Sequence, residues 1–264
     1  MGLFQKSKRI VVKVGSSTLT HSTGALDLRR IEKLAKTLAD LKNTGKEVVL
    51  VSSGAVSAGI AKSGLGHRPN TLEEKQAMAS VGQSELMKIY DRLFSDWGHT
   101  VAQILMTRDV IDNPVRRIAA ENTFNTLLKM GCIPIVNEND AVSTDELTKF
   151  GGNDILSAHV ANLCKADILI NLSDIDGLYD SDPRKNPNAK FIARVECIDE
   201  ILGYAGGAGT DRGTGGMEAK LTAAKMVTEN GIPMFIMNGR DPEILYDLLD
   251  GKSVGTYFTA NKSQ

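Results

Sequence analysis

Short apolar runs alternate with stretches of helical periodicity along most of the chain. Each run has four to six residues and is bounded by glycine or polar residues, which is typical of strands buried on both faces of a parallel sheet. The runs are Ile10–Val14, Val48–Val51, Val101–Met106, Ile133–Val136, Ile168–Leu172 and Met234–Met237. Between them, apolar residues recur every three or four positions, as in amphipathic helices. The clearest sets are Ile31, Leu34, Ala35 and Leu38; Leu86, Ile89, Tyr90 and Leu93; Leu156, Val160 and Leu163; and Met217, Leu221 and Ala224.

This order of elements predicts an α/β fold, a three-layer αβα sandwich around a mainly parallel sheet. Segment Asp180–Asn188 interrupts the alternation with turn-forming residues, so we expect a hairpin or surface excursion there. Too few residues follow the last helical set to build an independent second domain. We therefore expect one domain over 1–264, with an N-terminal lobe over approximately 1–165 and a C-terminal lobe over 166–264.

The composition narrows the classes of partner. Of the 264 residues, 42% are hydrophobic, and 31 basic against 32 acidic residues leave a formal net charge of −1. This balance provides no basic field for nucleic acid or for an anionic membrane surface. No apolar run approaches the roughly 18 residues of a membrane-spanning helix, and the 3 cysteines show no paired spacing. We therefore expect a cytoplasmic protein that binds small molecules, and neither nucleic acid nor membrane.

A glycine-rich stretch near the C-terminus has the layout of a phosphate site. Gly213-Thr214-Gly215-Gly216 leads into Met217-Glu218-Ala219-Lys220, the first turns of an amphipathic helix. Glycines let backbone N–H groups approach a phosphate closely, the helix N-terminus adds positive potential, and Lys220 adds a full charge. The P-loop signature is absent, because Gly251-Lys252-Ser253 has Tyr246 where the leading glycine would be. The sequence therefore indicates phosphate chemistry on another scaffold.

Polar residues also follow several predicted strands, where open α/β sheets bind their ligands. Lys13 interrupts the first strand just before Gly15, so either its charge meets a partner or its side chain reaches solvent. Ser53 follows the second strand and either donates to a ligand carboxylate or caps a helix. After the fifth strand, Ser173 and Asp174 suit contact with ribose or phosphates.

A further polar cluster follows the fourth strand. Asn137-Glu138-Asn139-Asp140 comes first, and Asn153-Asp154 then opens a helix. Asp140 can pair with an ammonium group and Asn153 can serve either polarity, which suits a zwitterionic ligand. The structural alternatives are a turn for the cluster and helix capping for Asp154. The 4 histidines show no metal-ligand spacing, so we expect no protein-held metal site.

Taken in order, these motifs resemble the amino-acid kinase family over nearly the whole chain. They are Lys13-Val14-Gly15-Ser16-Ser17, Ser52-Ser53-Gly54-Ala55, Asn137–Val142, Asn153-Asp154, Asp176–Tyr179 and Gly213–Lys220. Within that family they most resemble the kinases that act on glutamate. The resemblance implies transfer of the γ-phosphoryl group of ATP, with Mg²⁺, to the side-chain carboxylate of L-glutamate. The product is L-glutamyl 5-phosphate, and the reaction is the first step of proline biosynthesis.

The resemblance also implies a role for each motif. Ser53, Asp140 and Asn153 would hold glutamate. ATP would be held by Lys13, Ser173, Asp174, Thr214, Gly215, Gly216, Met217, Glu218, Ala219 and Lys220. Lys13 and Lys220 would stabilise the phosphoryl group in transfer, with Asp154 fixing both ammonium groups.

Three features depart from the family pattern. Gly152 stands where many of these glutamate kinases carry an acidic residue, which removes any carboxylate role there, and Ser173 replaces a common threonine but keeps the hydroxyl. Many relatives continue into a C-terminal PUA domain, whereas this chain ends soon after Phe258, so we expect none.

Family precedent implies a homodimer or tetramer assembled through the N-terminal lobe, with Leu86, Ile89 and Leu93 or their neighbours as candidates for the contact. It also implies feedback inhibition by proline. Two alternatives stay open. One is another family member that acts on N-acetylglutamate, aspartate, carbamate or UMP, and the other is a non-catalytic nucleotide or amino-acid sensor. The Asn137–Val142 stretch favours glutamate, because Asp140 meets a free ammonium only if the acceptor is not acetylated.

Overall fold

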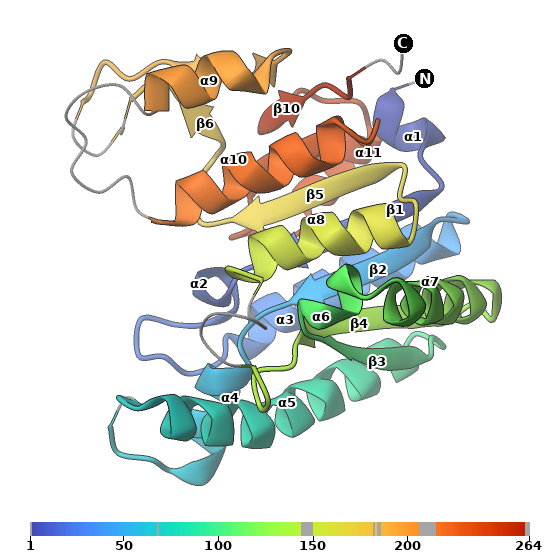
Figure 1. Ribbon diagram of the computed structural model, residues 1–264, viewed down its shortest axis with the longest axis vertical. Helices are drawn as coiled ribbons and strands as arrows, with labels where there is room; N and C mark the ends of the chain where they lie inside the picture. Colours follow the sequence, from blue (N-terminus) through green and yellow to red (C-terminus); the bar gives the residue numbers. More distant parts are fainter. Residues whose placement is uncertain are drawn as a thin grey trace.

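The computed structural model describes residues 2–67, 69–143, 150–181, 183, 186–205 and 215–261. Its middle layer is an eight-stranded sheet in the order β3-β4-β2-β1-β5-β9-β10-β8. Helices cover both faces of this sheet (Figure 1). The predicted three-layer αβα sandwich is confirmed.

Six strands form the parallel part of the sheet, and they match the six predicted runs. They are β1 (Arg9–Val14), β2 (Glu47–Ser52), β3 (Val101–Met106), β4 (Ile133–Glu138), β5 (Ile168–Ser173) and β9 (Met234–Asn238). Two short strands extend it: β10 (Thr256–Phe258) pairs antiparallel with β9, and β8 (Arg194–Val195) pairs with β10. In addition, β6 (Leu178–Tyr179) and β7 (Phe191–Ile192) pair antiparallel, which confirms the hairpin expected around Asp180–Asn188.

Two apolar layers lie on the two faces of the sheet. One contains side chains from α1 (Leu3–Lys6), α2 (Ser16–Leu19), α3 (Leu28–Asn43), α5 (Leu72–Ser95) and α11 (Ile244–Leu249). The other contains side chains from α6 (Asp109–Asp112), α7 (Pro114–Lys129), α8 (Asn153–Leu163), α9 (Ile198–Ala205) and α10 (Gly215–Thr228). The predicted helical sets all lie in these layers. No helix within the described ranges is both long and apolar enough to span a membrane.

The alternation of side chains along β1 decides which layer each one joins. Ile10 and Val12 pack in the layer of α3 and α5, whereas Val11 packs in the layer of α8 and α10. Because successive strand residues point to opposite faces, Lys13 must share the face of Val11. The sequence pattern thus aims this lysine at α8 and α10.

The close approach of α4 (Ala55–Ser63) and α5 depends on two glycines. A Cβ atom at Gly82 would overlap the backbone of Ala55, and one at Gly59 would overlap the backbone of Met78. The two helices therefore touch through their backbones. This contact fixes the start of α4, and with it the Ser53-Gly54 turn at the end of β2.

Two expectations are wrong at the sheet edge and on α5. Strand β3 is not buried on both faces, because it is the outermost strand, and Leu105 on it is 37% exposed. Leu86 and Leu93 are buried in the protein's own core, and Ile89 packs against the same core. Leu86 and Leu93 are therefore not available for a contact between subunits, whereas Ile89 is half-buried, and a contact through it or its neighbours stays a prediction.

Candidate active site

Three buried charged side chains meet at the carboxyl edge of the sheet. Lys13 lies near the end of β1, Asp154 in the first turn of α8 and Lys220 in the second turn of α10. Lys13 Nζ is 2.6 Å from Asp154 Oδ1, and Lys220 Nζ is 3.1 Å from Asp154 Oδ2. Their exposed fractions are only 5%, 8% and 9% in chain order. Each oxygen of one carboxylate thus holds one ammonium group, as the family resemblance implied.

The register of the sheet supplies a fourth member of this cluster. Lys13 on β1 pairs with Asn171 on β5, so the two side chains lie next to each other on the same face. Asn171 Nδ2 donates to Asp154 Oδ1 at 2.6 Å. Lys220 Nζ also donates to the carbonyl of Gly216, one helical turn earlier, at 3.2 Å. Sequence reasoning gave Asn171 no role, although a fully buried asparagine in an apolar strand is a signal of a polar partner.

The electrostatics follow from burial and from the shared carboxylate. Burial lowers the pKa of Lys13 below its ordinary value, and the Asp154 carboxylate opposes this shift. Burial alone would raise the pKa of Asp154, but the ammonium groups of Lys13 and Lys220 outweigh it and keep the pKa below its ordinary value. Two ammonium groups and one carboxylate leave one net positive charge. A buried excess charge is costly, so the cluster favours an anionic ligand such as a phosphate.

The structural alternatives for three predicted residues are excluded. Lys13 does not reach solvent. Asp154 faces the two lysines, and the cap position of α8 is Gly152. Ser53 does not cap α4, because that position is occupied by Gly54.

Asn153 organises the neighbouring polar residues. Its Nδ2 lies 2.7 Å from Ser53 Oγ, 3.3 Å from the carbonyl of Ser52 and 2.9 Å from Asn137 Oδ1. The structure therefore brings the predicted acceptor residues Ser53 and Asn153 into direct contact. Asn137 belonged to a quoted motif but had no assigned role, and it is only 4% exposed.

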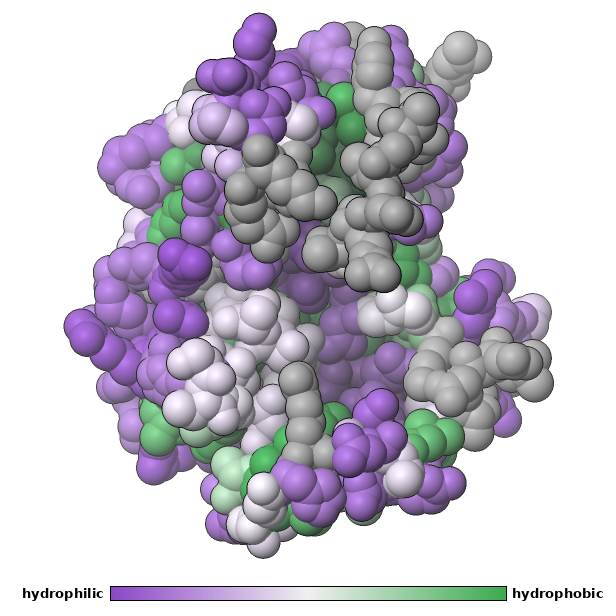
Figure 2. Space-filling view, turned by 90° about the vertical axis from the view of Figure 1, so that its left-hand side faces the viewer, coloured by the Kyte–Doolittle hydropathy of each residue, from purple (hydrophilic) through white to green (hydrophobic). Residues whose placement is uncertain are grey.

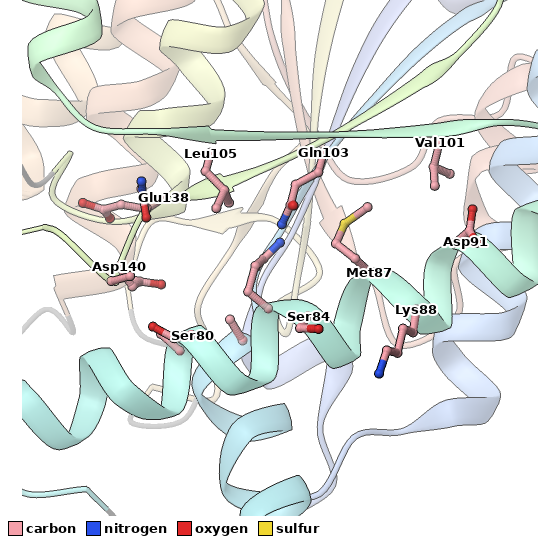
Figure 3. Close-up of a pocket in the computed structure, with 15 residues that line it drawn as sticks. Ser80, Ser84, Met87, Lys88, Asp91, Val101, Gln103, Leu105, Glu138 and Asp140 are labelled. Carbon is pink, nitrogen blue, oxygen red and sulfur yellow. The ribbon is translucent and has the colours of Figure 1, made fainter.

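The third predicted acceptor residue, Asp140, lies in the loop after β4, three residues beyond Asn137. It is half-buried, and with Glu138 and Asn139 it lines a cavity of about 620 Å³ between α5 and β3 (Figure 3). Glu138 fixes the loop, because its Oε1 accepts hydrogen bonds from Ser143 Oγ at 3.0 Å and from the backbone N–H of Phe150 at 3.2 Å.

The predicted nucleotide residues lie on the other side of the lysine cluster. Ser173 is buried at the end of β5, and its hydroxyl donates to Asp174 Oδ1 at 3.2 Å. Asp174 is exposed, and its carboxylate is close enough to oppose slightly the lowering of the Lys13 pKa that burial causes. The run Gly215, Gly216, Met217, Glu218, Ala219 and Lys220 forms the first turns of α10. Gly213 and Thr214 lie outside the described residues.

The predicted residues that the structure describes therefore gather at one edge of the sheet, on both sides of the lysine cluster. Figure 2 looks onto this edge, where hydrophilic side chains line a recess in the middle of the molecule. Gly152 lies at the same edge with a φ of 108°, a conformation that residues with a side chain avoid, which accounts for a glycine at this position.

Comparisons with known proteins identify the family of the chain. The model of the "Amino acid kinase family" matches residues 8–238. A glutamate 5-kinase of Clostridium perfringens is 56% identical, over 98% of this chain and 97% of its own length. One of Listeria innocua is 50% identical, over 98% of this chain and 96% of its own.

Solved structures share the fold at low sequence identity. A UMP kinase of Bacillus anthracis superimposes with a TM-score of 0.64 at 18% identity, covering 98% of each chain. An isopentenyl phosphate kinase of T. acidophilum superimposes with a TM-score of 0.62 at 16% identity, covering 95% of this chain and 99% of its own. From the match along most of its length and from these relatives, the chain belongs to the amino acid kinase family.

Proposed function

We propose that the protein transfers the γ-phosphoryl group of ATP to the side-chain carboxylate of L-glutamate, which forms L-glutamyl 5-phosphate and begins proline biosynthesis. The observation that carries this proposal is the buried pair of lysines, Lys13 and Lys220, held on the two oxygens of Asp154. Such a cluster suits a reaction in which anions must be brought together.

The chemistry needs positioning and positive charge rather than a protein nucleophile. A glutamate carboxylate is ionised at neutral pH, so no general base is required. One carboxylate oxygen forms a bond to the γ-phosphorus while the bond from that phosphorus to the β,γ-bridging oxygen breaks, and ADP leaves with that electron pair. ATP enters as its Mg²⁺ complex. The negative charge on the oxygens of the phosphoryl group in transfer is stabilised by the ammonium groups and by the metal ion that ATP brings.

The two halves of the reaction are assigned to the two sides of the lysine cluster. Ser53, Asn153 and Asp140 hold glutamate in the N-terminal lobe, approximately residues 1–165. Asp140 provides a half-buried carboxylate for the free ammonium group. The C-terminal lobe, residues 166–264, holds ATP through Ser173, Asp174 and the stretch from Thr214 to Lys220. The family relatives named glutamate 5-kinase support this acceptor over the others.

A side-by-side assay tests the acceptor. ADP release with Mg²⁺-ATP is measured with L-glutamate, N-acetylglutamate, aspartate, carbamate and UMP. We expect turnover with glutamate and at most a small fraction of that rate with the others, and we expect proline to raise the apparent KM for glutamate. Preferred turnover of another acceptor would contradict the proposal, and no turnover with any of them would favour a sensor.

Removing either lysine tests the cluster itself. We expect Lys13→Ala and Lys220→Ala each to lower kcat about 10²–10³-fold, because each deletes one charge that supports the phosphoryl group. Lys225→Ala is the control, since Lys225 also lies on α10 but is paired at the surface with Asp199. Circular dichroism checks that all three variants fold. Near-normal kcat in Lys220→Ala would overturn the assignment.

The proposal extends to a homodimer or homotetramer assembled through the N-terminal lobe. Its support is the outermost strand β3 together with two exposed apolar residues on α7, Val115 at 77% and Ile118 at 55%. Sedimentation velocity is expected to return a dimer or tetramer, shifted towards monomer by Val115→Asp combined with Ile118→Asp. A wild-type monomer at micromolar concentration would reject this part.

A further inference from the structure

A chain of side-chain hydrogen bonds leads from α5 to the acceptor residues. Gln83 Oε1 accepts from Asn137 Nδ2 at 3.0 Å, Asn137 Oδ1 accepts from Asn153 Nδ2 at 2.9 Å, and Asn153 Nδ2 also donates to Ser53 Oγ at 2.7 Å. Gln83 and Asn137 are buried, at 8% and 4% exposure. We call Gln83, Asn137, Asn153 and Ser53 the amide relay. It joins a helix on one face of the sheet to the first residue of α8 on the other.

Backbone groups fix the polarity of the amide relay. The carbonyl of Ser52 can only accept, so the amide edge of Asn153 that faces it must be Nδ2. The backbone N–H of Glu138 can only donate, and it bonds Asn137 Oδ1 at 2.9 Å. Asn137 therefore directs its Nδ2 donor towards Gln83, so Gln83 must accept this hydrogen bond through Oε1. These orientations follow from the partners and not from the choice of atom names.

The orientation of Asn153 decides whether the hydroxyl of Ser53 donates or accepts a hydrogen bond within the amide relay. Ser53 Oγ accepts from Asn153, so its own O–H proton stays available to donate to an anion. Ser53 is half-buried at the edge where the lysine cluster lies. A glutamate carboxylate accepts hydrogen bonds only, so this state matches the proposed acceptor.

In its observed orientation, the side-chain amide of Gln83 forms the hydrogen bond to Asn137 but leaves its other end without a partner among the described residues. That other end, the Nε2 donor, is buried. An unpaired buried donor is costly. The orientation of this amide is therefore dictated by the amide relay rather than by its own surroundings. Gln83 also lines the cavity that contains Asp140.

From this geometry we propose that Gln83 is a positioning residue for the acceptor. It holds Asn137, and through Asn137 and Asn153 it keeps Ser53 ready to donate to the substrate carboxylate. The inference rests on the proposed function, because it takes glutamate as the acceptor. It adds a residue on α5, outside the predicted nucleotide residues, that controls how well the acceptor binds.

Steady-state kinetics of Gln83→Met test this role. Methionine keeps the length of the side chain but removes the accepting oxygen. We expect the KM for glutamate to rise about tenfold, the size of losing one buried polar partner, while the KM for ATP and the kcat stay within about twofold. The control is Gln5→Met, because Gln5 lies on α1 and donates to the carbonyl of Leu249, away from the cavity and from the relay. The control is expected to leave all three constants unchanged.

A double-mutant cycle separates this role from a general loss of stability. In a Ser53→Ala background, Gln83→Met is expected to change the KM for glutamate less than twofold, because the relay then has no hydroxyl to orient. An unchanged KM in the single variant, or a full additional loss in the Ser53→Ala background, would overturn the inference. Gln83→Ala serves in the same way if Gln83→Met does not fold. Wild-type protein that does not phosphorylate glutamate would instead reject the proposed function.

Discussion

The carboxylate of Asp154 is the interaction on which the rest of the site depends. It holds two ammonium groups from residues at least 66 positions away along the chain, and all three residues are more than nine-tenths buried. Two buried ammonium groups without a shared anion would repel each other and would each bear the cost of desolvation. Both lysines lower the pKa of this carboxylate. Its two ion pairs therefore hold β1, α8 and α10 in position relative to one another.

Because α8 begins at this point, it also links the two halves of the proposed reaction. Asn153 and Asp154 are consecutive, and successive side chains of a helix point about 100° apart. Asn153 accordingly faces Ser53 and the amide relay, whereas Asp154 faces the lysines. The acceptor site and the phosphoryl site are thus held by one rigid helix start. Phosphoryl transfer depends mainly on such positioning, so a small rotation of α8 would disturb both sites together.

Much of the fold could be predicted because local patterns carry it. The six parallel strands and the four main helical sets follow from apolar periodicity. The burial expected for β3 and the subunit contact expected for Leu86 were wrong, because strand order and helix packing are set by tertiary structure. The short strands β8 and β10 have too few residues for a pattern.

For the site, the motifs indicated the charged residues and Asn153, but the partners of the supporting amides could not be predicted from the sequence. Gln83 and Asn137 are 54 residues apart, and a glutamine on a helix face carries no local sign of its partner. Asn171 reaches Asp154 only because β1 and β5 are neighbours in the sheet. Such roles depend on register and packing, which a single sequence does not state.

The pKa of Lys13 tests most directly whether the Asp154 carboxylate stabilises the buried ammonium groups. The ammonium group can be followed by NMR of ¹³C-labelled lysine, with its signal assigned by loss in Lys13→Arg. In the wild-type protein the pKa of Lys13 is expected below its ordinary value of 10.5, because burial outweighs the Asp154 carboxylate. In Asp154→Asn that opposing charge is gone, so the pKa should fall further. An equal or higher pKa in the variant would contradict the account.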